Sequence, residues 1–401
     1  MCHAQSAVSC QSALATARRY GENVLAPRDG RGRALARKRA TMFLDHPAIE
    51  PIRALMEDPE VTEIMINGPE MVFVERRGVM EVAPLKFRDE QQLNRLVAAL
   101  LQPMGRSVSA SAPFVDFRLP DGSRGNVTIS PVALNGPVVT IRRFTKTLTK
   151  VSDLMRVGTI SKRMAHLLGV AIKGRANLIF TGATGTGKTT TLAIFGRYIP
   201  ETERIVTIED TAELQFYQKN VVRLECRQAN VEGKGAITLS HLVRNALRMR
   251  PTRIIVGEIR GDEAVDMLQA IASGHQGCLA VLHASSPLDA VSRLELMSLS
   301  RGLMLPLWAI HKQIASAIDL IVQHEFLSDG TRKITRITEL AGVEGDAIVL
   351  QDLFAYRRTG ADPAGRETGE WVSGGTKPRF LQRCEKMGFT LPPEVYAAGT
   401  E

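Results

Sequence analysis

The chain has 401 residues, 44% of them apolar, which is enough for two domains that each bury a core of their own. Charged residues make up 23% and aromatic residues 5%, a composition that is ordinary for a globular protein and argues against a base-stacking nucleic-acid surface. No apolar run approaches the roughly 18 residues of a membrane span, and the first residues lack the basic start and apolar stretch of an export signal, so we expect a cytoplasmic protein.

The five cysteines occur singly, without a C-x-x-C pair, which argues against a zinc ribbon and, in a reducing compartment, against disulfides. The net charge is +9, and residues 1–45 supply more than half of it, with eight basic side chains against three acidic ones. Because this segment has few large apolar residues, we predict a basic, disordered tail. The basic charge of this tail would favour binding to an anionic membrane surface or to nucleic acid. A tail that is only solvated and binds neither is an equal alternative.

A small N-terminal α+β domain is predicted over residues 46–145. The predicted helices are Ile49–Met56 and Glu90–Leu101, and the predicted strands are Glu63–Asn67, Met71–Glu75, Phe114–Leu119, Gly125–Ile129 and Val138–Phe144. Asp121 and Gly122 form an Asp-Gly pair between two of these strands, which predicts a hairpin with a type I′ turn.

Residues 146–160 are predicted to be a linker, and residues 161–401 a larger α/β domain with a C-terminal extension. The linker starts with the polar stretch Thr145–Lys150, and Ser152–Gly174 is predicted to be a helical segment that leads into the larger domain. Short β-branched runs alternate with helical segments there, which is the pattern of a parallel sheet with crossover helices. The runs are Asn177–Phe180, Ile205–Ile208, Arg253–Gly257 and Cys278–Leu282. Three later runs, Asp319–Gln323, Arg332–Ile337 and Ala347–Leu350, are predicted to form an antiparallel addition.

The most specific motif is G-x-x-x-x-G-K-[ST] at Gly182–Thr189, between a predicted strand and a predicted helix. A strand–loop–helix of this kind directs consecutive backbone N–H groups and a helix N-terminus at one phosphate. We expect Lys188 to reach the β- and γ-phosphates of ATP and the Thr189 hydroxyl to coordinate Mg²⁺. The predicted nucleotide-binding residues are Gly182, Ala183, Thr184, Gly185, Thr186, Gly187, Lys188, Thr189 and Thr190.

Phosphoryl transfer also needs a group that orients or deprotonates the attacking water. Glu258 follows a short apolar run and is the predicted base, while Glu209 and Asp210 end another predicted strand. A Walker B strand usually ends in Asp-Glu, and here Gly257 stands at the Asp position. We therefore expect metal support from Thr189, from water, and from Glu209 and Asp210.

Two histidines bracket a predicted strand whose end should lie near the nucleotide: His275 precedes it and His283 follows it. We predict that they sense the γ-phosphate or a neighbouring subunit. Their spacing offers no third ligand for a metal site.

An arginine is a further requirement, because a guanidinium group supplied by a neighbour stabilises the charge on the γ-phosphate during its transfer. The larger domain has no obvious arginine finger in its phosphate motif. The candidates are four residues of the small domain: Arg118, Arg124, Arg142 and Arg143.

Four segments in fixed order resemble the Walker A, Asp box, Walker B and His box of type II/type IV secretion ATPases. They are Gly182–Thr190, Arg204–Leu214, Arg248–Arg260 and the stretch from Gly274 to Ala284. Within that superfamily the chain is most similar to the CpaF/TadA ATPases of Tad (Flp) pilus assembly. The segments that carry this finer resemblance are Val61–Pro69, Asp116–Arg124, Thr140–Phe144 and Glu339–Asp346. The likeness runs from about residue 45 to the C-terminus.

The resemblance implies a bilobed subunit with a RecA-like motor domain, a homohexameric ring, and nucleotide bound between the two domains. It implies that Arg124 and Arg142 are the arginines that reach this nucleotide. It further implies ATP hydrolysis that moves polytopic inner-membrane platform proteins, with peripheral membrane association and no specific nucleic acid. The chain departs from the expected His box at residues 272–278, and it lacks the four-cysteine zinc module of the type II branch.

Three other functions remain open at this stage. A conjugative type IV secretion ATPase would use the same chemistry on a different cargo. A DNA-translocating or recombinase-like ATPase would account for the basic charge, although more than half of that charge lies in the tail. A scaffold that binds nucleotide without turnover would not need Glu258.

Overall fold

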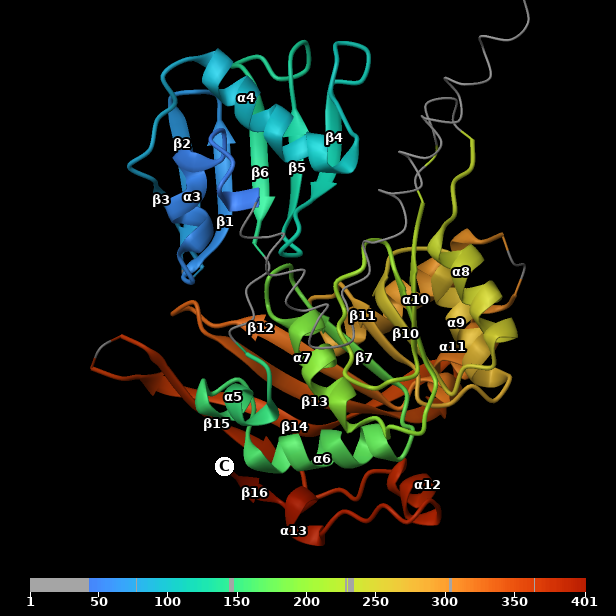
Figure 1. Cartoon of the computed structure of the whole chain (residues 1–401). Coiled ribbons are helices and arrows are strands. Elements are labelled where there is room, and N and C mark those ends of the chain that lie inside the picture. The colour runs from blue at the N-terminus through green and yellow to red at the C-terminus, as the bar shows by residue number, and fades with distance from the viewer. Residues whose placement is uncertain are drawn as a thin grey trace, which may run out of the picture. The chain divides into compact units, whose positions relative to one another are not determined.

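The computed structural model describes residues 43–76, 78–143, 148–227, 229, 234–302, 305–363 and 365–401 (Figure 1). The chain divides into two compact units, Met1–Thr147 and Leu148–Glu401. The predicted tail lies outside the described residues, apart from its last three positions. Within the described ranges no helix is both long enough and apolar enough to cross a membrane.

In its described residues, unit 1 is an antiparallel sheet with the two α-helices α3 and α4. Its six strands follow the order β3-β2-β1-β6-β5-β4. The elements are α3 (Glu50–Glu57), β1 (Val61–Asn67), β2 (Met71–Arg76), β3 (Val79–Val82), α4 (Glu90–Leu101), the 3₁₀ turn η1 (Gln102–Met104), β4 (Phe114–Arg118), β5 (Arg124–Thr128) and β6 (Val138–Arg142). Leu93, Leu96 and Leu100 of α4 are fully buried with Ile64 and Ile66 of β1, so the periodic apolar positions form the core of this unit.

The turn between β4 and β5 differs from the predicted type I′ turn. Residues 119–123 connect the two strands, and only Gly122 among them has a positive φ, at 96°. A type I′ turn needs positive φ at both central residues, and Asp121 does not have it. The Asp121 carboxylate instead accepts hydrogen bonds from the backbone N–H and the hydroxyl of Ser123, at 2.8 and 2.7 Å. The side chain of Asp121, rather than its backbone conformation, therefore stabilises this turn.

Unit 2 has a sheet of ten strands in the order β16-β15-β14-β13-β12-β7-β11-β10-β8-β9. The strands are β7 (Leu178–Gly182), β8 (Ile205–Glu209), β9 (Val221–Glu225), β10 (Arg253–Ile259), β11 (Leu279–Leu282), β12 (Leu320–Phe326), β13 (Arg332–Glu344), β14 (Ala347–Ala361), β15 (Glu367–Ser373) and β16 (Gly399–Thr400). The run from β12 to β9 is parallel. The predicted antiparallel addition therefore starts at β13 and not at β12.

The helices of unit 2 cover both faces of its sheet. They are α5 (Val151–Arg156), α6 (Lys162–Lys173), α7 (Lys188–Phe195), α8 (Leu239–Ala246), α9 (Glu263–Ala272), α10 (Pro287–Ser300), α11 (Leu307–Ala317), α12 (Leu381–Lys386) and α13 (Pro393–Tyr396), with the 3₁₀ turns η2 (Gly196–Tyr198) and η3 (Leu247–Met249). Along β7, Leu178 and Phe180 join the core beneath α6 and α7, whereas Ile179 joins the core beneath α8 to α11. This alternation along one strand shows that β7 is buried on both sides.

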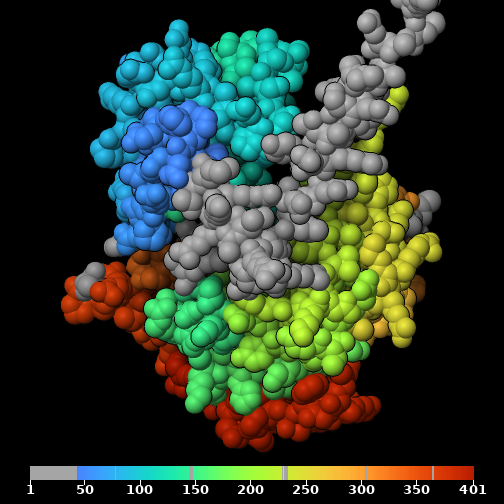
Figure 2. All heavy atoms as spheres, viewed as in Figure 1, coloured from blue at the N-terminus to red at the C-terminus, as the bar shows by residue number. Residues whose placement is uncertain are grey.

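Two segments of unit 2 extend what the sequence patterns predict. The predicted linker at residues 146–160 contains α5, and Leu154 and Ile160 are buried in the core of unit 2. From residue 148 onward, this stretch therefore packs as part of the unit. At the other end of the chain, α12 and α13 pack against α6, and Figure 2 shows this C-terminal segment in red next to the green surface of α6.

Candidate active site

The loop between β7 and α7 has the backbone that its glycines predict. Gly182, Gly185 and Gly187 have positive φ values of 142°, 80° and 97°. At Gly182 an added Cβ atom would lie 2.3 Å from the backbone oxygen of His324, so this position also needs glycine for space. Helix α7 begins at Lys188, directly after the loop. Its first N–H groups and the positive end of its dipole are thus available to an anion at the loop.

Lys188 lies within this loop rather than in solvent. Its side chain is largely buried, and its Nζ atom donates a hydrogen bond of 2.6 Å to the carbonyl of Ala183. The Thr186 hydroxyl donates to the same carbonyl at 2.8 Å. Ala183, Thr184 and Thr190 are exposed, and Thr189 is half-buried. The charged end of Lys188 is therefore held next to the backbone that would surround a phosphate group.

Glu258 and His283 are brought together from two neighbouring parallel strands. Glu258 lies in β10, and His283 follows β11 directly. The His283 Nε2 atom lies 2.9 Å from Glu258 Oε1, and Arg260 contacts Glu258 Oε2 at 2.7 Å. Lys188 acts electrostatically on the carboxyl of Glu258 and on the ring of His283. The predicted base, one predicted sensor and the loop lysine thus form one cluster at the carboxyl edge of the sheet.

The charges within this cluster favour an ionised Glu258 and a neutral His283. Partial burial raises the pKa of Glu258, but the hydrogen bond and charge of Arg260, with smaller effects of His283 and Lys188, bring it below its usual value. Burial and the positive charge of Lys188 lower the pKa of His283, although Glu258 opposes this. At neutral pH, His283 therefore donates its Nε2–H to one oxygen of an ionised Glu258, whose other oxygen accepts from Arg260.

Glu209 explains why glycine stands at position 257. The side chain of Glu209 is 2% exposed, and its Oε2 atom accepts N–H bonds from Glu213 and Leu214 at 2.6 and 2.8 Å. A Cβ atom on Gly257 would lie 2.8 Å from Glu209 Cγ, so an aspartate at position 257 has no room. Burial raises the pKa of Glu209 to about 7, although the two N–H bonds oppose this. Glu209 is thus an internal carboxyl beside β10, the strand that contains Glu258.

The structure places the predicted site residues Asp210 and His275 outside the contact between Glu258 and His283. The Asp210 side chain is 44% exposed, and its carboxylate lies 3.9 Å from Arg260 Nη1. His275 contacts the carbonyl of Ala270 and the hydroxyl of Ser273 through Nδ1, at 3.2 and 3.3 Å. These contacts of His275 are at the end of α9, and none of them involves Glu258 or His283.

The predicted arginines belong to unit 1, whereas the phosphate loop belongs to unit 2. Arg124 in β5 is paired with Arg118 in β4 on one side and with Arg142 in β6 on the other. Arg143 has a different role, because its guanidinium contacts the carbonyls of Leu55 and Val61 at 3.2 and 3.1 Å. We therefore remove Arg143 from the candidates, and Arg118, Arg124 and Arg142 remain.

Two residues that were not among the predicted site residues also contact this site. Arg260 connects Glu258 with Asp210. His324 is fully buried behind the loop, and its Nε2 atom lies 3.0 Å from the hydroxyl of Thr191 in α7. Arg260 directly follows β10, two residues after Glu258, a signal that could have been used. His324 could not have been found, because its position depends on β12 lying beside β7 in the sheet.

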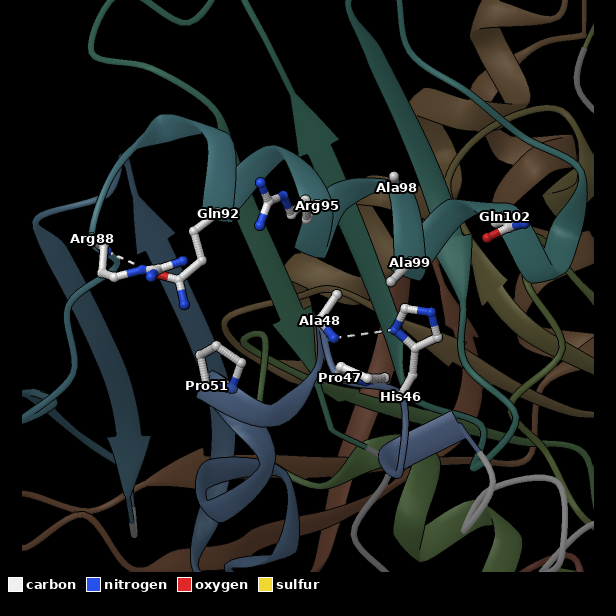
Figure 3. Close-up of a pocket in the computed structure, with 10 residues that line it drawn as sticks. All are labelled: His46, Pro47, Ala48, Pro51, Arg88, Gln92, Arg95, Ala98, Ala99 and Gln102. Carbon is white, nitrogen blue, oxygen red and sulfur yellow. Dashed lines mark hydrogen bonds between the residues drawn. The ribbon is translucent and has the colours of Figure 1, made fainter.

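Two surface hollows among the described residues lie apart from this cluster. One, of about 430 Å³, lies in unit 1 between residues 46–51 and α4, with Arg88, Gln92 and Arg95 in its lining (Figure 3). The other, of about 540 Å³, lies in unit 2 and is lined by residues of β12 to β14 and the start of α10. None of the predicted site residues lines either hollow. The candidate active site is therefore the cluster at the phosphate loop.

Comparison with known proteins identifies the family. The sequence pattern of type II/IV secretion system proteins matches residues 46–346. This chain belongs to that family. It is 33% identical over 319 residues to a Mycobacterium tuberculosis protein named for conjugal transfer, covering 78% of this chain and 90% of that protein. It is 32% identical over 322 residues to the type IV secretion system protein VirB11 of Brucella suis. This match covers 73% of this chain and 89% of that protein.

Solved structures show a similar fold. The pilus retraction motor PilT with bound ADP has a TM-score of 0.53 and 19% identity, covering 85% of this chain and 87% of that one. The ATPase DotB of Legionella pneumophila has a TM-score of 0.52 and 20% identity, covering 88% of each chain. The range that matches the family, residues 46–346, contains all the predicted site residues.

Proposed function

We propose that this chain is an ATP-hydrolysing motor of a pilus-assembly or secretion machine. The observation that carries the proposal is the cluster of Glu258, His283 and Lys188 at a phosphate loop with the backbone of an anion site. Membership of the type II/IV secretion family supports it. The subunit would act as a homohexamer in the cytoplasm, peripherally associated with the inner membrane and with polytopic platform proteins there.

In this proposal Glu258 is the base that activates water. It is ionised at neutral pH, and its contact with His283 fixes one carboxylate oxygen. The other oxygen contacts Arg260, which can shift toward Asp210 when a water molecule takes its place. Lys188 would then leave the carbonyl of Ala183 and neutralise the charge that develops on the phosphate.

Mg²⁺ fits this site with few protein ligands. The described residues contain no cluster of three His, Cys, Asp or Glu side chains that could hold a metal. Mg²⁺ bound to nucleotides commonly takes most of its ligands from phosphates and water. Glu209 is buried with one oxygen bonded to the backbone, so we assign metal support to the Thr189 hydroxyl and the exposed Asp210.

Arg124, Arg142 and His275 enter the proposal at the level of the ring. The two arginines would reach the nucleotide of a neighbouring subunit, since they extend from adjacent strands of unit 1 at the same register position. His275 would report on that neighbour, because its contacts leave it outside the cluster of Glu258 and His283.

The cargo is proposed to be the pilin subunits of a Tad (Flp) pilus. The segments Val61–Pro69 and Glu339–Asp346, which resemble the CpaF/TadA branch, support this proposal. A conjugative type IV secretion ATPase is the second candidate, because curated relatives are named for conjugal transfer and for type IV secretion. Neighbouring genes for a small prepilin and paired platform proteins would support the pilus, and their absence would favour conjugation.

Nucleotide binding by Lys188 is tested by substitution. Lys188→Ala should lower the affinity for Mg²⁺–ATP at least tenfold, because it removes the only cation that the structure places within this loop among the described residues. Lys312→Ala is the matched control, since Lys312 is an exposed lysine of α11 outside the site, and it should bind as wild type does. Isothermal titration calorimetry measures both. Equal affinity of Lys188→Ala and wild type would refute the loop assignment.

A further inference from the structure

The turn that joins β12 to β13 brings two side chains against the phosphate loop. Strand β12 is parallel to β7, with His324 opposite Gly182, so the residues after His324 pass beside the loop. The Phe326 Cζ atom lies 3.4 Å from the position of a Cβ atom built on Gly185. The Arg332 Cδ atom lies 4.0 Å from the position of one built on Gly187. Neither residue belongs to a motif that the sequence indicates.

Phe326 and Arg332 also contact each other. The guanidinium carbon of Arg332 lies 5.5 Å from the centre of the Phe326 ring, within the range of a cation–π interaction. Both side chains are exposed, and Phe326 is 39% exposed. The pair therefore forms a small surface of one aromatic ring and one positive charge beside the three glycines of the loop.

The exposure of Phe326 contrasts with the rest of its strand. Leu320, Ile321, Val322 and His324 are fully buried, as expected for a strand inside a parallel sheet. Single exposed apolar side chains are common on protein surfaces, so the informative feature of Phe326 is its position against Gly185 of the loop. An aromatic ring that stays accessible next to a phosphate loop offers a face on which a nucleobase can stack.

We propose that Phe326 and Arg332 form the platform for the nucleoside half of the bound nucleotide. The nucleobase stacks on the Phe326 ring. Arg332 holds this ring in place and adds positive charge beside the phosphates. The inference rests on the proposed function, because it deepens the same nucleotide site. In this arrangement the phosphate loop binds the triphosphate of the nucleotide, and the platform of Phe326 and Arg332 binds its nucleobase.

This division is tested with two ligands that share a phosphate chain. One is the slowly hydrolysed analogue AMP-PNP, and the other is inorganic tripolyphosphate, which has no base. With Mg²⁺ present, Phe326→Ala should lower the affinity for AMP-PNP about tenfold and leave that for tripolyphosphate unchanged, since one base–aromatic stack is lost. Arg332→Ala should lower both affinities. Isothermal titration calorimetry on the full chain provides these values.

Two variants serve as controls. Phe326→Tyr keeps an aromatic face and should retain the wild-type affinity for AMP-PNP. Trp308→Ala removes an exposed aromatic ring of α11, outside the site, and should change neither affinity. A circular dichroism spectrum of each variant matched to wild type shows that the fold is intact.

Three results would overturn the platform. Equal losses for both ligands in Phe326→Ala would mean that the ring only shapes the loop. No loss for AMP-PNP would mean that the base lies elsewhere. No effect of Arg332→Ala on either ligand would remove Arg332 from the platform. Failure of the proposed function is distinguishable, because wild type and Lys188→Ala would then bind AMP-PNP equally.

Discussion

At the scale of single residues, the side chain of Glu209 fills the space beside Gly257 of β10. Glu209 is fixed by the N–H groups of Glu213 and Leu214, so it cannot easily move away from β10. Gly257 leaves room for it, and the next residue, Glu258, is free to contact His283. The missing aspartate of the Walker B strand is thus a consequence of packing against Glu209.

Gly257→Ala tests this packing. The added methyl group would lie 2.8 Å from Glu209 Cγ, so we expect the free energy of unfolding to fall by about 1–3 kcal/mol and ATP hydrolysis to fall with it. Gly261→Ala is the matched control, because its Cβ atom would meet only Glu263 Oε2 at 3.8 Å. Urea unfolding of both variants measures the difference.

The same substitution in a Glu209→Ala background completes the test. With Glu209 truncated, Gly257→Ala should cost clearly less than it does in wild type, because the colliding atom is gone. An equal cost in both backgrounds would show that Glu209 is not what excludes a side chain at position 257.

The individual residues of the site were predictable to different degrees. The loop of Lys188 is a local motif, and its glycines have the backbone that the motif requires. The contact of Glu258 with His283 was not predictable in detail, because it depends on the register of β10 with β11. Phe326 and His324 gave no signal, since only the order of strands in the sheet places them at the loop.

At the scale of elements, β12 supports the phosphate loop from behind. The carbonyl of Val322 can only accept a hydrogen bond, so His324 carries its hydrogen on Nδ1 and donates it to this carbonyl, 3.2 Å away. His324 Nε2 then accepts a hydrogen bond from the hydroxyl of Thr191, in the first turn of α7. Burial of His324 lowers its pKa to about 4, so this ring is neutral in the folded protein.

This neutral histidine makes stability depend on pH in a defined direction. The pKa is lower in the folded state than the 6.5 of an ordinary histidine, so only the unfolded chain binds a proton between these values. The stabilising contribution is therefore complete above about pH 6.5 and is lost as the pH falls to about 4, by an amount of the order of 3 kcal/mol. Urea unfolding of wild type and His324→Gln between pH 4.5 and 7.5 measures this contribution. The variant should lose less stability on acidification, and identical pH dependence of the two proteins would contradict the role of His324.

The elements themselves were partly predictable. Alternating runs indicated the strands β7, β8, β10 and β11 because they are short, β-branched and separated by helices. The parallel placement of β12 could not be read from its sequence, since it follows from the crossover through α10 and α11. The segment Ser152–Gly174, which is predicted to be helical, contains two helices, α5 and α6, with a break between Arg156 and Lys162.

At the scale of the whole molecule, our proposal assigns different tasks to the two units. Unit 2 contains the phosphate loop, the proposed general base Glu258 and the platform of Phe326 and Arg332. Unit 1 contributes an antiparallel sheet with Arg124 and Arg142 in adjacent strands. A motor needs such a division, because hydrolysis in one unit has to be converted into movement of another. The net charge of +9 does not contradict this function, since more than half of it comes from residues 1–45.

The central claim is that Glu258 activates water for ATP hydrolysis at this site. The most direct test is the steady-state rate of phosphate release by wild type and Glu258→Gln, together with the ATP affinity of both. Glutamine keeps the shape of the side chain but cannot take a proton. The account predicts that kcat falls by about 10²- to 10⁴-fold while ATP still binds as it does to wild type. Hydrolysis by Glu258→Gln at the wild-type rate would contradict it.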